Sequence, residues 1–161
     1  AVSACSLMAE ACAWAKDKGM DFQGMLADIY KTYGFSLEVG VSVVRPGKSG
    51  AEEIQALMKQ FRENPPKTLA GSPVEVVKDY LSLNATHADG KVEKLDFPTT
   101  SNVLQYFTAD GSKVSVRPSG TEPKIKFYIE VKGTLASEAE YDATVAAADT
   151  KIAAVKADLG I

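Results

Sequence analysis

The residues of this sequence best suited to chemistry lie in the run Arg-Pro-Ser-Gly-Thr-Glu-Pro-Lys at positions 117–124. Two hydroxyl residues, Ser119 and Thr121, flank Gly120, which permits a positive φ and lets successive backbone N–H groups converge. Alternation along the preceding strand places Arg117 on the face opposite the core, where its forked guanidinium can meet a ligand. Amides, hydroxyls and guanidinium together match a phosphate dianion in charge and in donor count. The run therefore predicts an anion cradle.

The other charged residues of the run have less direct roles. A carboxylate repels phosphate, so Glu122 is expected to turn away from the cradle and to pair with Lys124 or brace Arg117. Lys124 and Lys126 add positive potential at the rim. The residues after Lys124 have strand period, so the amides must hold an anion without a helix dipole. By residue type alone, a Pro/Gly turn with Arg117 in a surface ion pair explains the run equally well.

Alternating hydrophobicity predicts strands on both sides of this run. The cleanest alternation follows it directly, and an Ala-Asp-Gly turn at 109–111 joins the two strands before it into a hairpin. The segment 83–100 is polar and rich in turn residues, and we expect a long loop there with a short strand near 92–97. Besides that short strand, the predicted strands cover residues 37–43 and 74–80, the two hairpin strands at 102–108 and 112–116, and the strand after the run at 125–131.

Two amphipathic helices accompany these strands. One is predicted to begin with a capping box at residues 49–52 and to stop before Pro65. The other begins with a second capping box at residues 137–140, carries an apolar stripe and ends at Gly160. The resulting order, β-α-β-β-β-β-α, predicts an α+β fold with both helices on one face of the sheet.

The first 34 residues have the apolar spacing of two helices, over 2–19 and 22–34, and predict a helical hairpin. The first helix is apolar almost all round, so it is expected to pack on a neighbouring part of a longer chain. Cys5 and Cys12 fall about 10 Å apart on one helix face, beyond the reach of a disulfide, and are expected to be packed thiols. Core packing is also expected for Trp14 and the methionines at positions 8, 20, 25 and 58, with an interdomain surface of the intact protein as the alternative for Trp14.

Composition limits the function. With 161 residues, 45% of them hydrophobic, and a net charge of −3, the chain has the profile of a globular domain. The negative charge argues against nucleic acid and against a membrane surface as partners. No run approaches 18 apolar residues, and the start lacks the basic region of a signal peptide, so we expect a soluble, cytoplasmic protein. The one histidine, His87, is expected to be a solvated surface residue, and no catalytic triad can be assembled around it.

The run at 117–128, which continues Ile-Lys-Phe-Tyr after Lys124, resembles the phosphate-binding loop of the α-D-phosphohexomutases, the superfamily of phosphoglucomutase and phosphomannomutase. A weaker resemblance extends through 101–104 and back to the helices at 1–34. It implies that residues 1–35 are the C-terminal helices of the family's third domain. Residues 36–161 would then be its fourth and last domain, with a fold like that of TATA-box-binding protein.

The resemblance also implies roles for the residues of the cradle. Arg117, Ser119, Gly120 and Thr121 would hold the phosphate of the sugar that is not being transferred, and Lys124 matches the same motif. The family reaction is a magnesium-assisted transfer between a phosphoserine and the sugar, through a sugar 1,6-bisphosphate that reorients. The cradle must accept phosphate at either end of the sugar, so it is expected to recognise the dianion rather than the sugar.

The family's nucleophilic serine loop, its aspartate-rich metal loop and its sugar-recognition loop have no counterpart in this sequence. We therefore expect no catalytic residue and no Mg²⁺ ligand here, and the implied partners are a phosphosugar and upstream domains of the same chain. Gly120 and the long segment between residues 80 and 101 favour the branch that interconverts glucose 1-phosphate and glucose 6-phosphate. Phosphomannomutase, phosphopentomutase and a non-enzymatic module that binds a phosphorylated ligand remain open alternatives.

Overall fold

The computed structural model describes residues 2–161, with the exception of the side chain of Lys48. The chain divides into two compact units, which are described separately. One comprises Ala1–Ser36 and Gly133–Ala148, and the other comprises Leu37–Lys132 and Asp149–Ile161. The predicted division into mutase domains at residue 35 stays a prediction.

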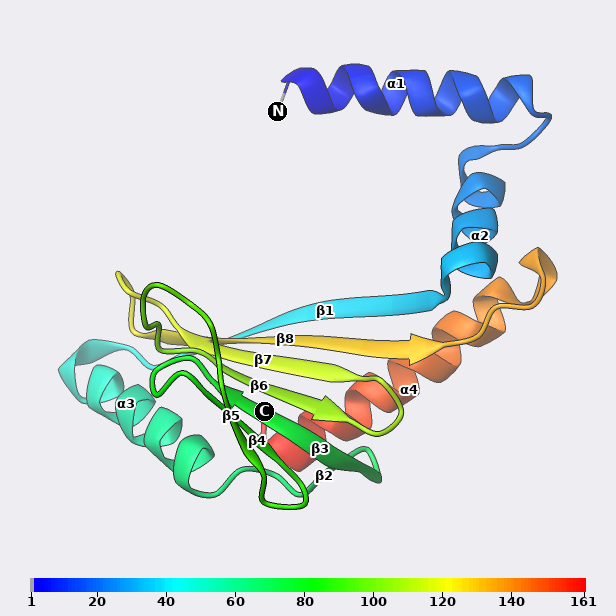
Figure 1. Cartoon of the computed structure of the whole chain (residues 1–161). Helices are drawn as coiled ribbons and strands as arrows, with labels where there is room; N and C mark the ends of the chain where they lie inside the picture. Colours follow the sequence, from blue (N-terminus) through cyan, green and yellow to red (C-terminus); the bar gives the residue numbers. More distant parts are fainter. Residues whose placement is uncertain (1) are drawn as a thin grey trace. The chain divides into compact units, whose positions relative to one another are not determined.

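The strands form a single sheet in the order β1-β8-β7-β6-β3-β4-β5, and β2 pairs with β3 beside this path (Figure 1). Neighbours from β8 to β5 are antiparallel, as are β2 and β3. The predicted α+β class is confirmed, whereas the likeness to TATA-box-binding protein stays a prediction. The strands are β1 Phe35–Val44, β2 Thr68–Leu69, β3 Ser72–Asp79, β4 Asn84–His87, β5 Val92–Lys94, β6 Leu104–Thr108, β7 Lys113–Pro118 and β8 Lys124–Gly133.

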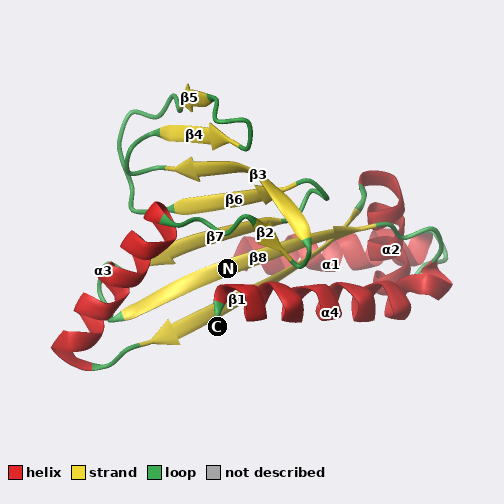
Figure 2. Ribbon diagram, turned by 90° about the horizontal axis from the view of Figure 1, so that it is seen from below, coloured by secondary structure: helices red, strands yellow, loops and turns green. Residues whose placement is uncertain are grey.

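Two helices cover one face of this sheet, α3 (Gly47–Glu63) and the C-terminal half of α4 (Tyr141–Leu159), as Figure 2 shows. The period of two in the strands aligns their buried side chains on that face. The hydroxyl of Tyr106 on β6 donates a 3.0 Å hydrogen bond to the carbonyl oxygen of Phe61 on α3. The buried residues from strands and helices are Leu104, Tyr106, Val114, Val116, Ile125, Phe127, Ile129, Val131, Ile54, Met58, Phe61, Ile152, Val155 and Leu159. The opposite face carries the alternate residues, including Arg117, so the predicted orientation of the strands is confirmed.

The predicted N-terminal helices are present as α1 (Val2–Asp17) and α2 (Phe22–Tyr33). The side chain of Asp21 caps α2 by accepting a 2.7 Å hydrogen bond from the N–H of Gly24. Gly34 ends the helix with a φ of 94°, a conformation that suits glycine. Tyr30 contacts the ring of Phe35 edge-on, with centroids 4.9 Å apart.

Two expectations for α1 are wrong. Cys5 and Cys12 are free but exposed, not packed. Trp14 and Met8, expected in the core, are each 51% exposed. The reason is that α1 buries only Ala15 among the described residues, so its apolar side chains have no core to enter.

Both predicted capping boxes are wrong. Helix α3 begins at Gly47 with Pro46 at its N-cap, so Ser49 already lies within the first turn. Ser137 makes no side-chain cap hydrogen bond, and a short 3₁₀ helix, η1 (Glu138–Glu140), precedes α4. Helix α3 thus begins two residues before Ser49, and a 3₁₀ turn separates Ser137 from the start of α4.

The segment 83–100 contains a hairpin, not the long loop that we expected. Strands β4 and β5 pair antiparallel across a turn that contains Asp89 and Gly90. Gly90 has a φ of 87°, and the side chain of Asp89 accepts a 2.9 Å hydrogen bond from the N–H of Lys91. The short strand expected near 92–97 is confirmed at Val92–Lys94, whereas β4 was not foreseen because Ala85 is its one apolar residue.

Candidate phosphate-binding site

The loop at residues 119–123 connects β7 to β8, and backbone hydrogen bonds close it at both ends. The strands pair up to Pro118 and Ile125, which lie opposite each other. The N–H of Ser119 then donates to the carbonyl oxygen of Lys124 at 2.8 Å, and the N–H of Lys124 donates to that of Glu122 at 2.8 Å. The sheet therefore fixes where this short loop begins and ends.

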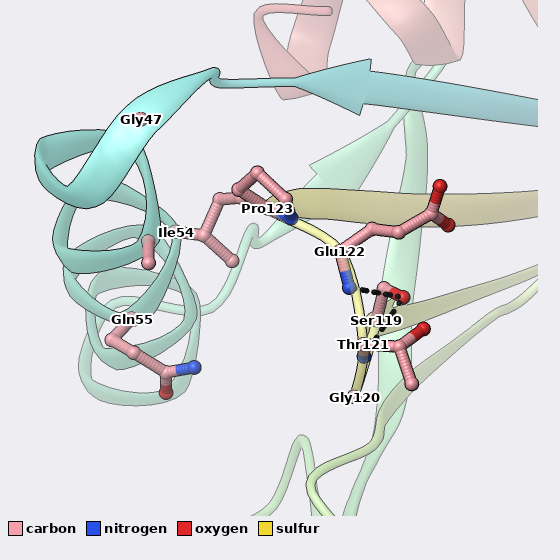
Figure 3. A pocket seen from close by; sticks show the side chains of 9 residues that line it. Gly47, Ile54, Gln55, Ser119, Gly120, Thr121, Glu122 and Pro123 are labelled. Atoms are coloured by element: carbon pink, nitrogen blue, oxygen red, sulfur yellow. Dashed lines mark hydrogen bonds between the residues drawn. The ribbon is translucent and has the colours of Figure 1, made fainter.

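Two successive backbone N–H groups of the loop converge on one point. The amides of Thr121 and Glu122 both point at Oγ of Ser119, with N···O distances of 3.5 Å and 3.3 Å (Figure 3). These distances are long for hydrogen bonds, so the amides hold the hydroxyl oxygen only weakly. An anionic oxygen at the same point makes stronger bonds with both N–H groups. The predicted convergence is present, although the chain's own hydroxyl supplies the acceptor.

The means of convergence differs from the prediction at Gly120. This glycine does not adopt a positive φ, unlike seven other glycines of the chain. A Cβ atom added to it would meet no atom within 4 Å. The loop therefore turns without a left-handed residue at Gly120, and the two 2.8 Å backbone hydrogen bonds at its ends close it.

Two hollows adjoin the loop. The first has a volume of about 320 Å³ and lies between the loop and α3, with Gln55 extending toward the loop in Figure 3. The side chains of Ser119, Thr121 and Glu122 point away from α3 in this view, so the first hollow meets the back of the loop. Its lining residues are Gly47, Ala51, Ile54, Gln55, Ser119, Gly120, Thr121, Glu122 and Pro123.

The second hollow brings Arg117 together with the loop. It has a volume of about 630 Å³ and includes Ser119 and Gly120. Its lining residues are Gln55, Ser101, Asn102, Val103, Arg117, Pro118, Ser119 and Gly120. Three of the five predicted site residues thus share this hollow, Thr121 lines only the first, and Lys124 lines neither.

The guanidinium of Arg117 is available to a ligand. Its side chain is exposed, and it makes no hydrogen bond or ion pair with residues 2–161 as the structure describes them. Arg117 therefore has no carboxylate partner in that range with which to form the surface ion pair of the alternative interpretation. Lys126 lies directly opposite Arg117 in the sheet and adds a second positive charge to this end of the strands.

The predicted pairing of Glu122 with Lys124 is confirmed. The ammonium of Lys124 contacts the carboxylate of Glu122, and the hydrogen bond and charge of Lys124 lower the pKa of Glu122. The ion pair neutralises the one carboxylate of the loop, which is exposed and directed away from α3. A direct role for Lys124 in phosphate binding stays a prediction, since its charge is engaged by Glu122.

The sequence did not identify the residues that complete the second hollow. Half-buried Arg62 on α3 donates from Nη2 to Oδ1 of Asn102 at 2.8 Å, and from Nε to Oδ2 of Asp79 at 3.1 Å. These bonds hold the segment at 101–103 against the hollow, and they leave the NH₂ group of Asn102 as its remaining side-chain donor. Arg62 and Asn102 are 40 residues apart, so no local pattern could reveal the contact.

His87 differs from its predicted environment. It lies on β4, where its side chain is only 32% exposed, and its Nε2 is 3.5 Å from the carboxylate of Glu93. Within the described range, no group of three or more His, Cys, Asp or Glu side chains could hold a metal ion. None of the helices described is long and apolar enough to cross a membrane.

Comparison with known proteins assigns the family. The model of the phosphoglucomutase/phosphomannomutase C-terminal domain matches residues 38–148, which include the whole loop and both of its strands. The chain belongs to the phosphoglucomutase/phosphomannomutase family. The match confirms the resemblance inferred from the run at 117–128.

Individual relatives agree with this family assignment. Phosphoglucomutase from Staphylococcus aureus strain N315 is 34% identical over 114 residues, which are 71% of this chain and 20% of that protein. Phosphoglucomutase from Staphylococcus haemolyticus strain JCSC1435 is 33% identical over 116 residues, or 72% of this chain and 21% of its own. The chain thus spans about a fifth of the length of these relatives.

Among solved structures, the open form of pp63/parafusin from Paramecium, which is described as a phosphoglucomutase, resembles the chain. The alignment covers 88% of this chain and 24% of parafusin, with 16% identity and a TM-score of 0.43. At this score the likeness adds nothing to the family assignment.

Proposed function

We propose that the loop between β7 and β8 binds the phosphate group of a phosphorylated sugar. The observation that carries this proposal is the free guanidinium of Arg117 in the same hollow as Ser119 and Gly120. The converging amides of Thr121 and Glu122 add two donors beside it. Membership of a phosphosugar mutase family supports phosphate as the anion.

The charges around the loop favour a dianion. Arg117 and Lys126 both carry positive charge at this end of the sheet, and the carboxylate of Glu122 is neutralised by Lys124. A hydrogen bond to a charged group contributes roughly 1.5–3 kcal/mol, and a guanidinium can offer two in parallel to phosphate. The donors are main-chain amides and a guanidinium, so the site recognises the phosphate group more than the sugar to which it is attached.

For the whole protein we propose phosphoglucomutase activity, the interconversion of glucose 1-phosphate and glucose 6-phosphate through a 1,6-bisphosphate. The relatives that match the chain carry that name. The contribution of this chain is to hold the phosphate that is not transferred, with upstream domains supplying the reacting groups. A cytoplasmic location remains a prediction from the sequence.

The described residues do not fit a magnesium site. Mg²⁺ requires several oxygen ligands in octahedral geometry, and the described side chains contain no suitable acidic cluster. Glu122, the one carboxylate within the phosphate loop, is paired with Lys124.

Calorimetric titration of the 161-residue chain tests the proposal. Glucose 1-phosphate and glucose 6-phosphate are both expected to bind, because the loop accepts the phosphate at either position. Glucose, which lacks the anion, is expected to give no heat of binding at the same concentrations. Equal binding of glucose and its phosphates, or no binding of either phosphate, would reject the assignment of the loop.

A further inference from the structure

Asn102 lines the second hollow just before the start of β6, level with the point where the phosphate loop begins. Leu104 on β6 lies opposite Val116 on β7, and the same register continued outward brings Asn102 level with Pro118, the residue before the loop. The hollow contains Asn102 together with Arg117. A ligand that fills this hollow therefore has both side chains on its walls.

Backbone hydrogen bonds fix the segment that carries Asn102. The N–H of Ser101 donates to the carbonyl oxygen of Tyr80 at 3.0 Å, and the N–H of Tyr80 donates to that of Val103 at 3.0 Å. The N–H of Val103 also donates to the carbonyl oxygen of Ser101 at 2.9 Å, which closes a tight turn around Asn102. The turn is thus tied to the end of β3, and it holds Asn102 at a defined place beside the loop.

The contact with Arg62 decides which end of the Asn102 amide is left for a ligand. A guanidinium carries only donors, so the atom of Asn102 that meets Nη2 of Arg62 at 2.8 Å is the oxygen, Oδ1. The NH₂ group is the other end of the amide, and it has no partner among the residues that the structure describes. Asn102 therefore presents N–H donors to a ligand in the hollow.

Asp79 holds Arg62 in this orientation and pairs with its charge. Oδ2 of Asp79 accepts a hydrogen bond from Nε of Arg62 at 3.1 Å, and Oδ1 accepts one from the N–H of Leu81 at 3.0 Å. Both side chains are largely shielded from water, with 25% of Arg62 and 14% of Asp79 exposed. Each donor in such a chain of hydrogen bonds polarises the next group, so the amide of Asn102 becomes a stronger donor.

A phosphate bound by Arg117 and the loop still has oxygen lone pairs to satisfy. A phosphate ester presents three strongly accepting oxygens. The amides of Thr121 and Glu122 offer one donor each, and the fork of Arg117 offers two in parallel. Arg117 comes from the face of the sheet opposite α3, whereas Asn102 lies on the side of α3, where it contacts Arg62. Asn102 therefore supplies donors from a different direction.

We infer that Asn102 is a further ligand of the phosphate and that Arg62 positions its NH₂ group. The inference rests on the proposed function, because the phosphate is the one that Arg117 and the loop are proposed to bind. Asn102 is a binding residue, since its N–H groups touch the ligand, and Arg62 is a positioning residue, since it acts through Asn102. The amide is uncharged, so it recognises the acceptor oxygens of phosphate without increasing the attraction for other anions.

Titration of the full chain with inorganic phosphate separates a ligand from a structural residue. Asn102→Asp keeps an oxygen that accepts from Arg62 but replaces the NH₂ group with an anionic oxygen, so it should weaken binding by more than about tenfold. Asn102→Ala removes the donor without adding charge and should weaken binding about three- to tenfold, as for one hydrogen bond to a charged group at an exposed site. The matched control is Asn64→Ala, which removes an exposed amide at the C-cap of α3 that lines neither hollow beside the loop and should leave the affinity unchanged.

A double-mutant cycle tests the positioning role of Arg62. Arg62→Lys keeps a positive charge beside Asp79 but loses the second arm that reaches Asn102, so it should weaken phosphate binding about two- to threefold. The same substitution should have no effect in Asn102→Ala, because no amide remains to be oriented. An equal loss in both backgrounds would overturn the positioning role of Arg62.

The side-chain NH₂ signals of Asn102 give a measurement on the wild type that does not depend on the stability of any variant. In NMR spectra at constant ionic strength, phosphate is expected to shift these signals together with the backbone amides of Thr121 and Glu122. Shifts in the loop without a shift at Asn102, or an affinity unchanged by Asn102→Asp, would overturn the role of Asn102 and leave the loop intact. No shift at either place would overturn the proposed function as well.

Discussion

Replacing Arg117 with alanine removes the guanidinium from the second hollow without disturbing the core. The side chain is exposed and has no partner in the described range, so the substitution breaks no contact that the fold needs. We expect the melting temperature of the chain to stay within about 1–2 °C of the wild type, as for an exposed surface position. Any loss of phosphate affinity then reports on the ligand alone.

The size of that loss follows from two charge-assisted hydrogen bonds at a solvent-exposed site. Exposure favours the lower value for each, about 1.5 kcal/mol, so two bonds contribute about 3 kcal/mol before competition with water is considered. Each 1.4 kcal/mol corresponds to a factor of ten in the dissociation constant, so Arg117→Ala is expected to weaken phosphate binding about 10- to 100-fold. Arg117→Lys keeps the charge but loses the fork, and should fall between the wild type and alanine.

The matched control is Lys94→Ala, which removes the same charge from β5. In the sheet, β5 is the fourth strand away from β7, so at 4.8 Å between neighbouring strands the two strands lie about 19 Å apart. This exceeds the screening length of about 8 Å at physiological salt, so Lys94→Ala should leave the affinity unchanged. The measurement is isothermal titration of each variant with inorganic phosphate in one buffer of fixed ionic strength. Equal losses in the two variants, or no loss in Arg117→Ala, would refute a specific role for the guanidinium.

Three further substitutions test the charges and the core. Glu122→Gln removes the only carboxylate of the loop and releases Lys124, so phosphate titration should show binding about two- to fivefold tighter than wild type. Hydrogen bonds from Lys151 and two neighbours outweigh the effect of burial and hold the pKa of Asp110 well below 3.8. Because the pKa of Asp110 is lower in the folded than in the unfolded chain, its ionised carboxylate stabilises the fold at pH values above 3.8, and this stabilisation is lost as the pH falls toward the lowered pKa. Asp110→Asn should therefore cost up to about 1 kcal/mol of folding free energy at pH 7 and progressively less in acid. Thermal unfolding at a series of pH values measures this cost. Tyr106→Phe leaves a buried carbonyl of α3 without its donor and should cost about 1–1.5 kcal/mol in urea unfolding, with an unchanged value contradicting the contact.

The sequence was most informative where a period of two or of 3.6 coincides with burial. Residues 125–131 alternate so clearly because Ile125, Phe127, Ile129 and Val131 enter the core that α3 and α4 cover. The hairpin at 109–111 was equally clear, since Gly111 adopts the positive φ that such a turn requires. Patterns of this kind are set by neighbours that are close in sequence or on the same strand.

Features that depend on distant residues could not be foreseen. Strand β4 pairs with β3 and β5 but has a single apolar residue, Ala85, so it shows no apolar alternation that would reveal it. The start of α3 was misplaced for a different reason: its N-cap is Pro46, which makes no side-chain cap hydrogen bond, so the capping pattern at Ser49 does not mark the start of the helix.

The loop shows the same division between local and distant information. Residue types alone indicated its donors and the pairing of Glu122 with Lys124, because both depend on residues within the run. They also indicated a positive φ at Gly120, which is wrong: the amides of Thr121 and Glu122 converge on the hydroxyl of Ser119 without it. The support of the second hollow by Arg62 and Asn102 depends on the packing of α3 beside the end of β3.

The most direct test of the central claim is an amide NMR titration of the chain with inorganic phosphate. The loop is expected to respond first, with the largest shifts at the N–H groups of Thr121 and Glu122 as they exchange the oxygen of Ser119 for an oxygen of the ligand. Arg117→Ala should reduce these shifts at the same phosphate concentration. Phosphate that shifts other amides and leaves those of residues 119–122 unmoved would contradict the assignment of this loop.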